Sequence, residues 1–449
     1  MNLELNTRRY RMNPSDCLFH AFDHLLRRQG YSGTGTFLVL ELVGPLPAAD
    51  VQRALERALA AHPVTMAVPR TSLWRARPYW VCDRAPVPAH YTYDDLSQTP
   101  DWRRRADELC EERFSCGWDP ATPPQVRLEH YRGPAGEHRL CLRWAHALLD
   151  ADGARLFLAE MDRLGGGDGP PANLLPDDAG VDPLAGAGPL RRLRLMLRGL
   201  RDRSPDNPLI RGRLIGVLPD RPVASRRLRY IVRVWSPEIT TEIRSRAAAL
   251  NPAGPALYAR HLAGATLRAA WRVHAELGQD LPACGMMFPM RLAGPALRPV
   301  RGNYLGATAL TARRELLRDR RALGEHVART LADHVAHDGS RASWAMQRLT
   351  AGLRVAQYRR VIRWETRRQP FLTGFSYLGA SEPPLRRFLG ADVTNLYGGG
   401  VISIPPAWNV TFARCGERLN LVMAWPEGEL PERVVLRYAD LLEAEVLHE

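Results

Sequence analysis

The chain has 449 residues, of which 45% are hydrophobic and 24% charged, a composition typical of a globular protein with one large or two ordinary domains. No apolar run approaches the roughly 18 residues that a membrane-spanning helix needs, and the first residues lack the apolar segment of a secretory signal. The 7 cysteines are scattered without a zinc-ligand spacing, so we expect a cytoplasmic protein with reduced thiols and no metal.

The formal net charge is +14, and every one of the 62 basic residues is arginine. Such a surface favours anionic partners, for example phospholipid, coenzyme A, phosphopantetheine or an acidic carrier protein. We expect no nucleic-acid partner, because the sequence has no zinc-finger spacing, no RNP-like aromatic motif and no helix-turn-helix.

The first third of the chain predicts strands followed by helices. Residues 37–40 form an apolar strand, and the helix after it begins at Asp50 as its N-cap. Residues 125–146 predict a hairpin around the turn Gly-Pro-Ala-Gly. A second helix then begins with Asp152 as its cap and runs to about residue 164.

A change of composition follows this segment. Residues 165–189 are rich in glycine, proline and aspartate, which indicates a linker or a surface crossover. The stretch 190–203 then carries a leucine every three or four residues among arginines, which predicts a basic amphipathic helix. Two interpretations stay open: the leucines pack on the core, or the helix binds a membrane surface or an acyl carrier.

Strands and helices recur beyond residue 222, so two halves of similar size emerge. We expect an N-terminal subdomain over residues 1–165, a linker with the basic helix over 166–221, and a C-terminal subdomain over 222–449. The fold class is α/β, with helices and strands in two layers in each subdomain.

His146 ends the second strand of the hairpin, and Asp150 follows four residues later in the segment AHALLDADG. Histidine is suited to act as a general base, since its usual pKa of about 6.5 leaves it neutral near pH 7. A turn after a strand can present such a side chain to a crevice. The spacing alone also fits a histidine that only fills a gap in the structure.

The segment resembles the His-His-x-x-x-Asp-Gly motif of the CoA-dependent acyltransferase superfamily. This superfamily includes condensation domains of peptide synthetases, wax ester synthase/diacylglycerol acyltransferases and plant HxxxD acyltransferases. His146 matches the catalytic histidine and Asp150 the aspartate, whereas Ala145 and Ala151 replace the first histidine and the glycine. Further segments are similar to these proteins in the same order, namely 12–23, 114–131, 288–307, 375–380 and 407–425.

The resemblance implies two chloramphenicol-acetyltransferase-like subdomains in a V, with an active-site tunnel between them. His146 is then the general base, and Asp150 supports the site through an ion pair with Arg291, or alternatively as a cap of the turn. The polar residues that match tunnel-lining segments, as candidates for the oxyanion site, are Ser376, Asn303, Tyr304 and Asn409. For each of these four, an ordinary hydrogen bond at a turn or strand edge is the alternative.

The implied reaction moves an acyl group from a thioester of coenzyme A or a phosphopantetheinyl carrier protein to an alcohol or amine, in a bacterial biosynthetic pathway and without a permanently bound cofactor. One alternative is a lipid enzyme similar to wax ester synthases. Another is a non-catalytic module that binds an acyl carrier protein, which Ala145 and Ala151 leave open. We expect a cytoplasmic location, or contact with the inner membrane through the 190–203 helix.

Overall fold

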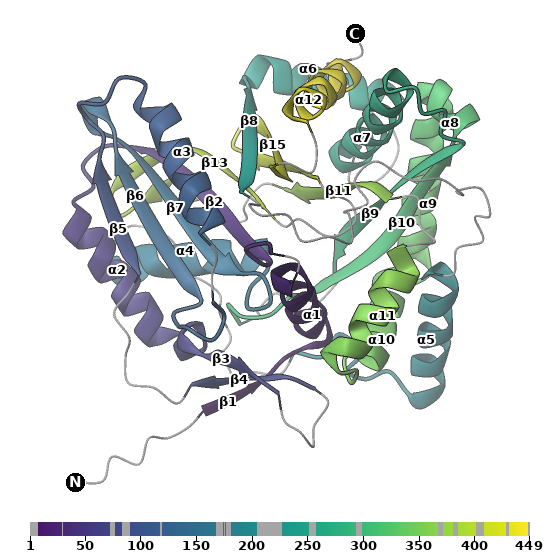
Figure 1. Ribbon diagram of the computed structural model, residues 1–449, viewed down its shortest axis with the longest axis horizontal. Helices are drawn as coiled ribbons and strands as arrows, with labels where there is room; N and C mark the ends of the chain where they lie inside the picture. The colour runs from purple at the N-terminus through teal and green to yellow at the C-terminus, as the bar shows by residue number, and fades with distance from the viewer. Residues whose placement is uncertain are drawn as a thin grey trace.

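The computed structural model describes residues 8–28, 30–71, 77–82, 90–116, 119–167, 174, 176, 181–203, 227–250, 257–292, 299–366, 371–379, 385–400, 408–427 and 431–447. These residues form two large mixed sheets with helices packed on them, and one small sheet (Figure 1). Among them, no helix combines the length and hydrophobicity that crossing a bilayer requires.

The first large sheet has the strand order β12-β13-β2-β7-β6-β5. Its strands are β2 (Gly35–Val43), β5 (Tyr91–Asp95), β6 (Val126–Arg132), β7 (Glu137–Ala145), β12 (Arg387–Phe388) and β13 (Ala391–Gly399). Side chains alternate along β2: Leu38 and Leu40 pack with α2 (Ala48–Ala61) and α4 (Ala151–Gly165), whereas Phe37 and Val39 pack with α3 (Trp102–Ser115). The sheet therefore has helices on both faces.

The second large sheet has the strand order β10-β9-β11-β14-β15-β8. Its strands are β8 (Leu228–Trp235), β9 (Ala283–Arg291), β10 (Leu305–Arg313), β11 (Phe371–Leu378), β14 (Asn409–Cys415) and β15 (Arg418–Pro426). The helices that share its core are α6 (Pro237–Leu250), α7 (Leu257–Glu276), α8 (Arg314–Arg318), α9 (Arg320–Ala336) and α12 (Glu432–Leu447). β11 runs parallel to both of its neighbours, β9 and β14.

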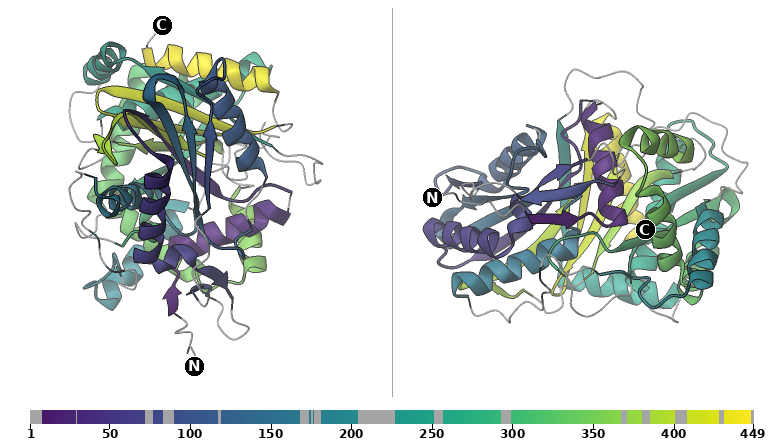
Figure 2. Two further views of the ribbon diagram at one scale, coloured as in Figure 1. Left: turned by 90° about the vertical axis from the view of Figure 1, so that its left-hand side faces the viewer. Right: turned by 90° about the horizontal axis from the view of Figure 1, so that it is seen from below.

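The remaining elements lie around these two lobes. The small sheet consists of β1 (Arg8–Arg11), β3 (Val68–Arg70) and β4 (Tyr79–Cys82). The other helices are α1 (Pro14–Arg28), α5 (Pro189–Arg203), α10 (Gly339–Thr350) and α11 (Val355–Thr366), with short 3₁₀ turns at Pro63–Met66 and Pro134–Gly136. α5 lies at the outer edge of the second lobe (Figure 1; right view of Figure 2).

Two details differ from the sequence predictions, and a third decides between two interpretations that the sequence left open. α2 begins at Ala48 with Pro47 as N-cap, so Asp50 lies in the first turn and does not cap the helix. α4 is capped by Asp150, and Asp152 lies in its first turn. The leucines of α5 do not pack on the core, because all four, Leu190, Leu193, Leu197 and Leu200, are exposed.

One segment of the C-terminal half belongs to the sheet of the first lobe. Residues 387–399, which the sequence assigned to the C-terminal subdomain, form β12 and β13, and β13 pairs antiparallel with β2 of the first sheet. Asn395 on β13 and Asn420 on β15 exchange amide hydrogen bonds of 3.0 Å in each direction. Strand β13 therefore belongs to the first sheet and contacts the second.

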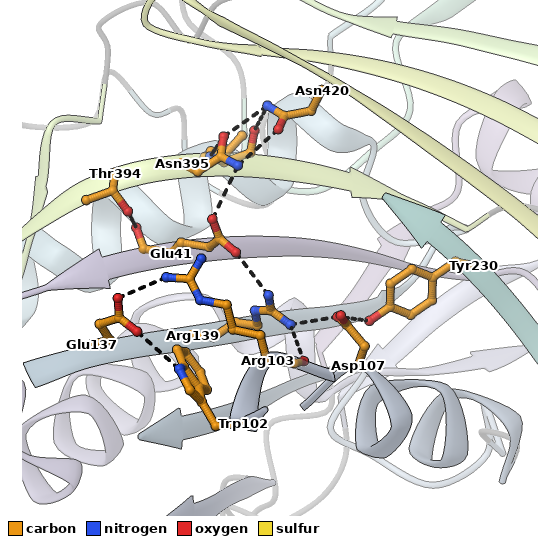
Figure 3. Close-up of polar contacts among 11 residues, drawn as sticks. Glu41, Trp102, Arg103, Asp107, Glu137, Arg139, Tyr230, Thr394, Asn395 and Asn420 are labelled. Atoms are coloured by element: carbon orange, nitrogen blue, oxygen red, sulfur yellow. Dashed lines mark hydrogen bonds and ion pairs between the residues drawn. The ribbon is translucent and has the colours of Figure 1, made fainter. Parts of the chain in front are cut away.

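A polar network of Glu41, Asp107, Arg139, Tyr230 and Asn395 extends this contact between the lobes (Figure 3). We call this network the interlobe seam. Arg139 on β7 donates to Glu41 at 3.0 Å and to Asp107 on α3 at 2.6 Å. Tyr230 on β8 of the second lobe donates its hydroxyl to the same Asp107 at 2.9 Å. Asn395 reaches the other oxygen of Glu41 at 3.3 Å. The seam joins the two lobes on the side of α3.

Candidate active site

The turn between β7 and α4 holds His146 through both its backbone and its ring. The His146 amide donates to the carbonyl of Thr34 at 3.2 Å, and the Asn303 side chain donates to the His146 carbonyl at 2.7 Å. The ring of Phe19 on α1 stacks on the imidazole, with centroids 3.7 Å apart and planes 13° apart. Three segments far apart in the sequence therefore fix the orientation of this side chain.

Burial favours the neutral form of the imidazole. It lowers the pKa of His146 below its usual 6.5, against the opposing effects of the residue's own carbonyl, the Asp150 carboxylate and Asn303. Nδ1 is buried and forms no hydrogen bond of normal geometry within the described part of the chain. Nε2 is therefore the ring nitrogen that can meet a substrate, and it carries a free lone pair in the Nδ1–H tautomer.

Asp150 fastens the end of this turn. Its Oδ1 accepts from the Gly153 amide at 2.8 Å as the N-cap of α4, and its Oδ2 accepts from the Tyr304 amide at 3.2 Å. The predicted ion pair with Arg291 is wrong: the recorded partner of Arg291 is Asp152, at 3.7 Å, and the Arg291 side chain is 63% exposed. Of the two predicted roles for Asp150, the structure has the cap.

Gly153 is needed where it stands. A Cβ on this residue would lie 2.4 Å from the carbonyl oxygen of Val300, closer than two such atoms approach. Leu149 and Gly302 also form a β-bridge, and the Gly302 amide donates to the carbonyl of Leu148 at 2.6 Å. The histidine turn of the first lobe is thus packed directly on the segment that leads into β10 of the second.

Asp16, on the first turn of α1, completes this arrangement from below the turn. Its Oδ1 accepts from both the backbone and the side-chain amide of Asn303, each at 2.9 Å. Its Oδ2 accepts from the Asn13 amide at 2.9 Å, and Asn13 in turn accepts from the Asp16 amide, as in a capping box. Burial raises the pKa of Asp16 to about 7. Asp16 lies in the matching segment 12–23, but no local pattern indicated a role for it.

His146 lines a pocket of about 460 Å³ whose walls come from both lobes. Trp144 and Thr36 contribute from the first lobe, and Ser376 and Asn409 contribute from β11 and β14 of the second. Gly374 leaves room for the side chain of Asn409, since a Cβ on residue 374 would lie 2.6 Å from Oδ1 of Asn409. The pocket can hold a small acceptor next to the imidazole.

Two of the four predicted oxyanion candidates line the histidine pocket, and the other two do not. Ser376 and Asn409 line the pocket together with His146. Asn303 is fully buried and holds the His146 carbonyl, so it supports the turn from behind. Tyr304 lines a second pocket, of about 410 Å³, and stacks on Trp344.

This second pocket is rich in arginine. Its basic lining residues are Arg9, Arg11, Arg77, Arg301 and Arg348, against a single acidic one, Asp182. Asp182 is itself paired with Arg348 at 2.9 Å. The segment around residues 301–305 separates the two pockets, because Arg301 and Tyr304 line the basic one and Leu305 lines the histidine pocket.

Arg155 is a pocket residue that sequence reasoning missed. It projects from α4 of the first lobe, and its guanidinium donates to the carbonyl of Gly379 in the second lobe at 2.9 Å. The side chain is 10% exposed and lines the histidine pocket, and burial lowers its pKa. Its position three residues after Asp152 on a helix was the only signal in the sequence that it would lie near the motif.

One group of side chains in the described part of the chain has ligand atoms close enough for a metal: Cys110, Glu129 and Cys141, all buried. Glu129 is already bound by Arg143 at 2.5 Å and by the hydroxyl of Tyr131 at 2.5 Å. A hydrogen bond with Cys110, together with burial, raises the pKa of Cys141, which keeps its thiol protonated. The group packs α3 on the first sheet, away from the histidine pocket.

No family model matches the chain, and a search of curated proteins also finds no match. Solved structures do match over nearly its whole length. The first condensation domain of the CDA synthetase aligns with a TM-score of 0.69 and 18% identity, covering 98% of this chain and 96% of that one. The trichothecene 15-O-acetyltransferase TRI3 from Fusarium sporotrichioides aligns with a TM-score of 0.72 and 11% identity, covering 98% and 95%.

A third match is a variant of the starter condensation domain of rhizomide synthetase, solved in complex with C8-CoA, with a TM-score of 0.65, 12% identity and coverages of 98% and 94%. Identities this low establish the fold alone. The chain has the fold of condensation domains and CoA-dependent acyltransferases, two chloramphenicol-acetyltransferase-like lobes, as the resemblance implied.

Proposed function

We propose that this protein transfers an acyl group from a thioester to a hydroxyl or amine acceptor, with His146 as the general base. The observation that carries the proposal is a partly exposed imidazole that opens into a pocket walled by both lobes, with a pKa that burial lowers. Its ring is held by Phe19 and its backbone by Asn303. A general base must be unprotonated at the working pH and directed at the proton that it removes, and these features favour both.

In the proposed reaction, Nε2 of His146 takes the proton of the acceptor as the acceptor's oxygen or nitrogen attacks the thioester carbonyl. The tetrahedral intermediate carries a negative oxygen, for which Ser376 and Asn409 are our candidate hydrogen-bond donors among the polar residues that line the pocket. The carbon–sulfur bond then breaks, and the imidazolium returns the proton to the departing thiolate. The products are an ester or amide and a free thiol, so charge and protons balance.

The arginine-rich pocket is suited to the anionic part of an acyl donor, such as the phosphates of coenzyme A or of a phosphopantetheinyl carrier. The rhizomide synthetase domain with C8-CoA gives a precedent for such a donor on this fold. Replacing Arg9 and Arg11 together by glutamine is expected to raise KM for acyl-CoA. The same change leaves KM for an uncharged N-acetylcysteamine thioester unaltered, because that donor lacks phosphates.

The direct test is intact-mass analysis of reactions that combine panels of acyl-CoA and acyl-carrier thioesters with alcohols and amines. We expect the wild-type protein to form an acylated acceptor and His146→Ala to form none above background. His337→Ala, which changes an exposed histidine, is the matched control and should retain activity. Binding of acyl carriers without turnover by the wild type would contradict the proposal and favour a non-catalytic module.

A further inference from the structure

The leucines of α5 form an apolar ridge on the outside of the molecule. The exposed fractions are 72% for Leu190, 47% for Leu193, 55% for Leu197 and 47% for Leu200. With 3.6 residues per turn, these positions fall on one side of the helix. Four large apolar side chains in one exposed row form a patch of the size that often marks a binding surface.

The opposite side of α5 fixes this orientation. Leu195 is 6% exposed and packs with Trp344 and Ala345 of α10. Gly199 lies so close to α10 that a Cβ there would be 2.4 Å from the carbonyl oxygen of Ala342. Arg191 pairs with Asp338 at 2.7 Å at the start of α10. The helix cannot rotate its leucines inward without losing these contacts.

Arginines accompany the ridge. The stretch 189–203 contains six arginines and one acidic residue, Asp202. Arg194 and Arg201 are exposed next to the leucines on the helical wheel, and neither forms an ion pair with any residue that the structure describes. The helix therefore presents apolar side chains and unneutralised positive charge on the same outward surface.

We propose that α5 docks the protein on an anionic lipid bilayer. The leucines enter the acyl-chain region, and Arg194 and Arg201 extend to the phosphates of the headgroups. The positive charge suits an anionic lipid and an acidic protein alike, and the size and shape of the ridge favour lipid. The ridge is convex and exposes on the order of 400 Å² of apolar surface, about half of what one partner contributes to a stable protein–protein interface. Lipids in a fluid bilayer can rearrange to cover both sides of such a ridge, whereas a rigid protein surface of this size cannot.

The test is flotation of the full chain with vesicles of phosphatidylglycerol and phosphatidylcholine, compared with vesicles of phosphatidylcholine alone. We expect the protein to float with the anionic vesicles and to bind the neutral vesicles much more weakly. Leu193→Ser combined with Leu197→Ser should weaken binding by about tenfold or more, since both side chains leave the acyl region. Arg194→Gln combined with Arg201→Gln should weaken it as well, most clearly at low salt.

The matched control is Leu277→Ser combined with Leu436→Ser, two leucines that are 41% and 40% exposed on other elements. This pair should float like the wild type. Failure of the wild type to bind anionic vesicles, or equal binding by the α5 and control pairs, would overturn the proposal. The proposal would also fail if the wild type self-associated with rising concentration and only Leu193→Ser combined with Leu197→Ser abolished this. A second copy of the chain would then bind the ridge. Acyl transfer from soluble thioesters is independent of this surface.

Discussion

The two lobes meet in two regions of contrasting chemistry. Along the interlobe seam, Arg139 is matched by two carboxylates, and one of these also accepts from Tyr230 of the second lobe. In the histidine pocket, by contrast, the imidazole of His146 lies beside an open cavity and faces no carboxylate at ion-pair distance among the described residues. Ion pairs hold the lobes together along the seam, and a titratable ring faces the cavity between them.

We therefore expect a substitution in the histidine pocket to lower turnover and a substitution in the interlobe seam to lower stability. His146→Ala should lower kcat by about 10²–10⁴-fold, the usual contribution of a general base. Its melting temperature should stay within about 2 °C of the wild type, because the ring makes one stacking contact and no side-chain hydrogen bond of normal geometry with the described residues. Parallel calorimetry and turnover measurements check both halves. A folded, fully active variant would contradict the account.

Arg139→Met should do the reverse. Removing the cation leaves Glu41 and Asp107 with only the neutral donors Asn395 and Tyr230, which should cost about 2–4 kcal/mol of the free energy of unfolding. Arg103→Met is the control, since Arg103 is 54% exposed in its pair with Glu137 and should cost at most about 1 kcal/mol. Chemical denaturation of both variants measures the difference. Equal costs would mean that the seam is no stronger than a surface ion pair.

Asp150→Ala is expected to affect both properties, because Asp150 caps α4 and also binds the segment before β10. The loss of the cap and of the partner of the Tyr304 amide should cost about 1–3 kcal/mol. Turnover should also fall, since the His146 turn is no longer fastened at its end. Arg291→Ala, which removes an exposed side chain, should change the melting temperature little. Similar losses from both variants would restore the predicted Asp150–Arg291 pair.

Phe19→Leu should have the smallest effect. Leucine keeps an apolar contact with His146 but loses the stacked ring, a contact worth about 0.5–1.5 kcal/mol. We expect kcat/KM to fall by roughly 2- to 12-fold while KM for the donor remains unchanged. Steady-state kinetics with a saturating donor measures the change. A fall as large as that of His146→Ala would indicate a more direct role for Phe19.

The sequence predicted the fold and placed His146 at the end of a strand, but it did not predict the side chains that hold His146. The strand, the turn and the order of the matching segments are local signals, and they were sufficient to place His146. The hydrogen bonds from Asn303 to Asp16 join residues 287 positions apart, and no local pattern reports such a pairing. Arg291 was assigned to Asp150 because both belong to matched motifs, yet Asp152, two residues further along, lies nearer its side chain.

The α5 helix illustrates a related limit. Periodicity correctly predicted that its leucines share one side, because that depends only on the helical repeat. Which side faces the protein depends on the helix that packs against it. Gly199 permits the close approach to α10 that turns the leucines outward. The presence of a glycine inside a helix does not show which other helix packs against it.

The pH dependence of kcat/KM in the wild-type protein tests the central claim most directly. Burial lowers the pKa of His146, so the neutral base persists to lower pH than for an ordinary histidine. The acid limb of the profile should therefore lie below pH 6.5 and fall with unit slope as the imidazole is protonated. The residual activity of His146→Ala should lack this limb. A limb that survives unchanged in His146→Ala would contradict the assignment of His146 as the base.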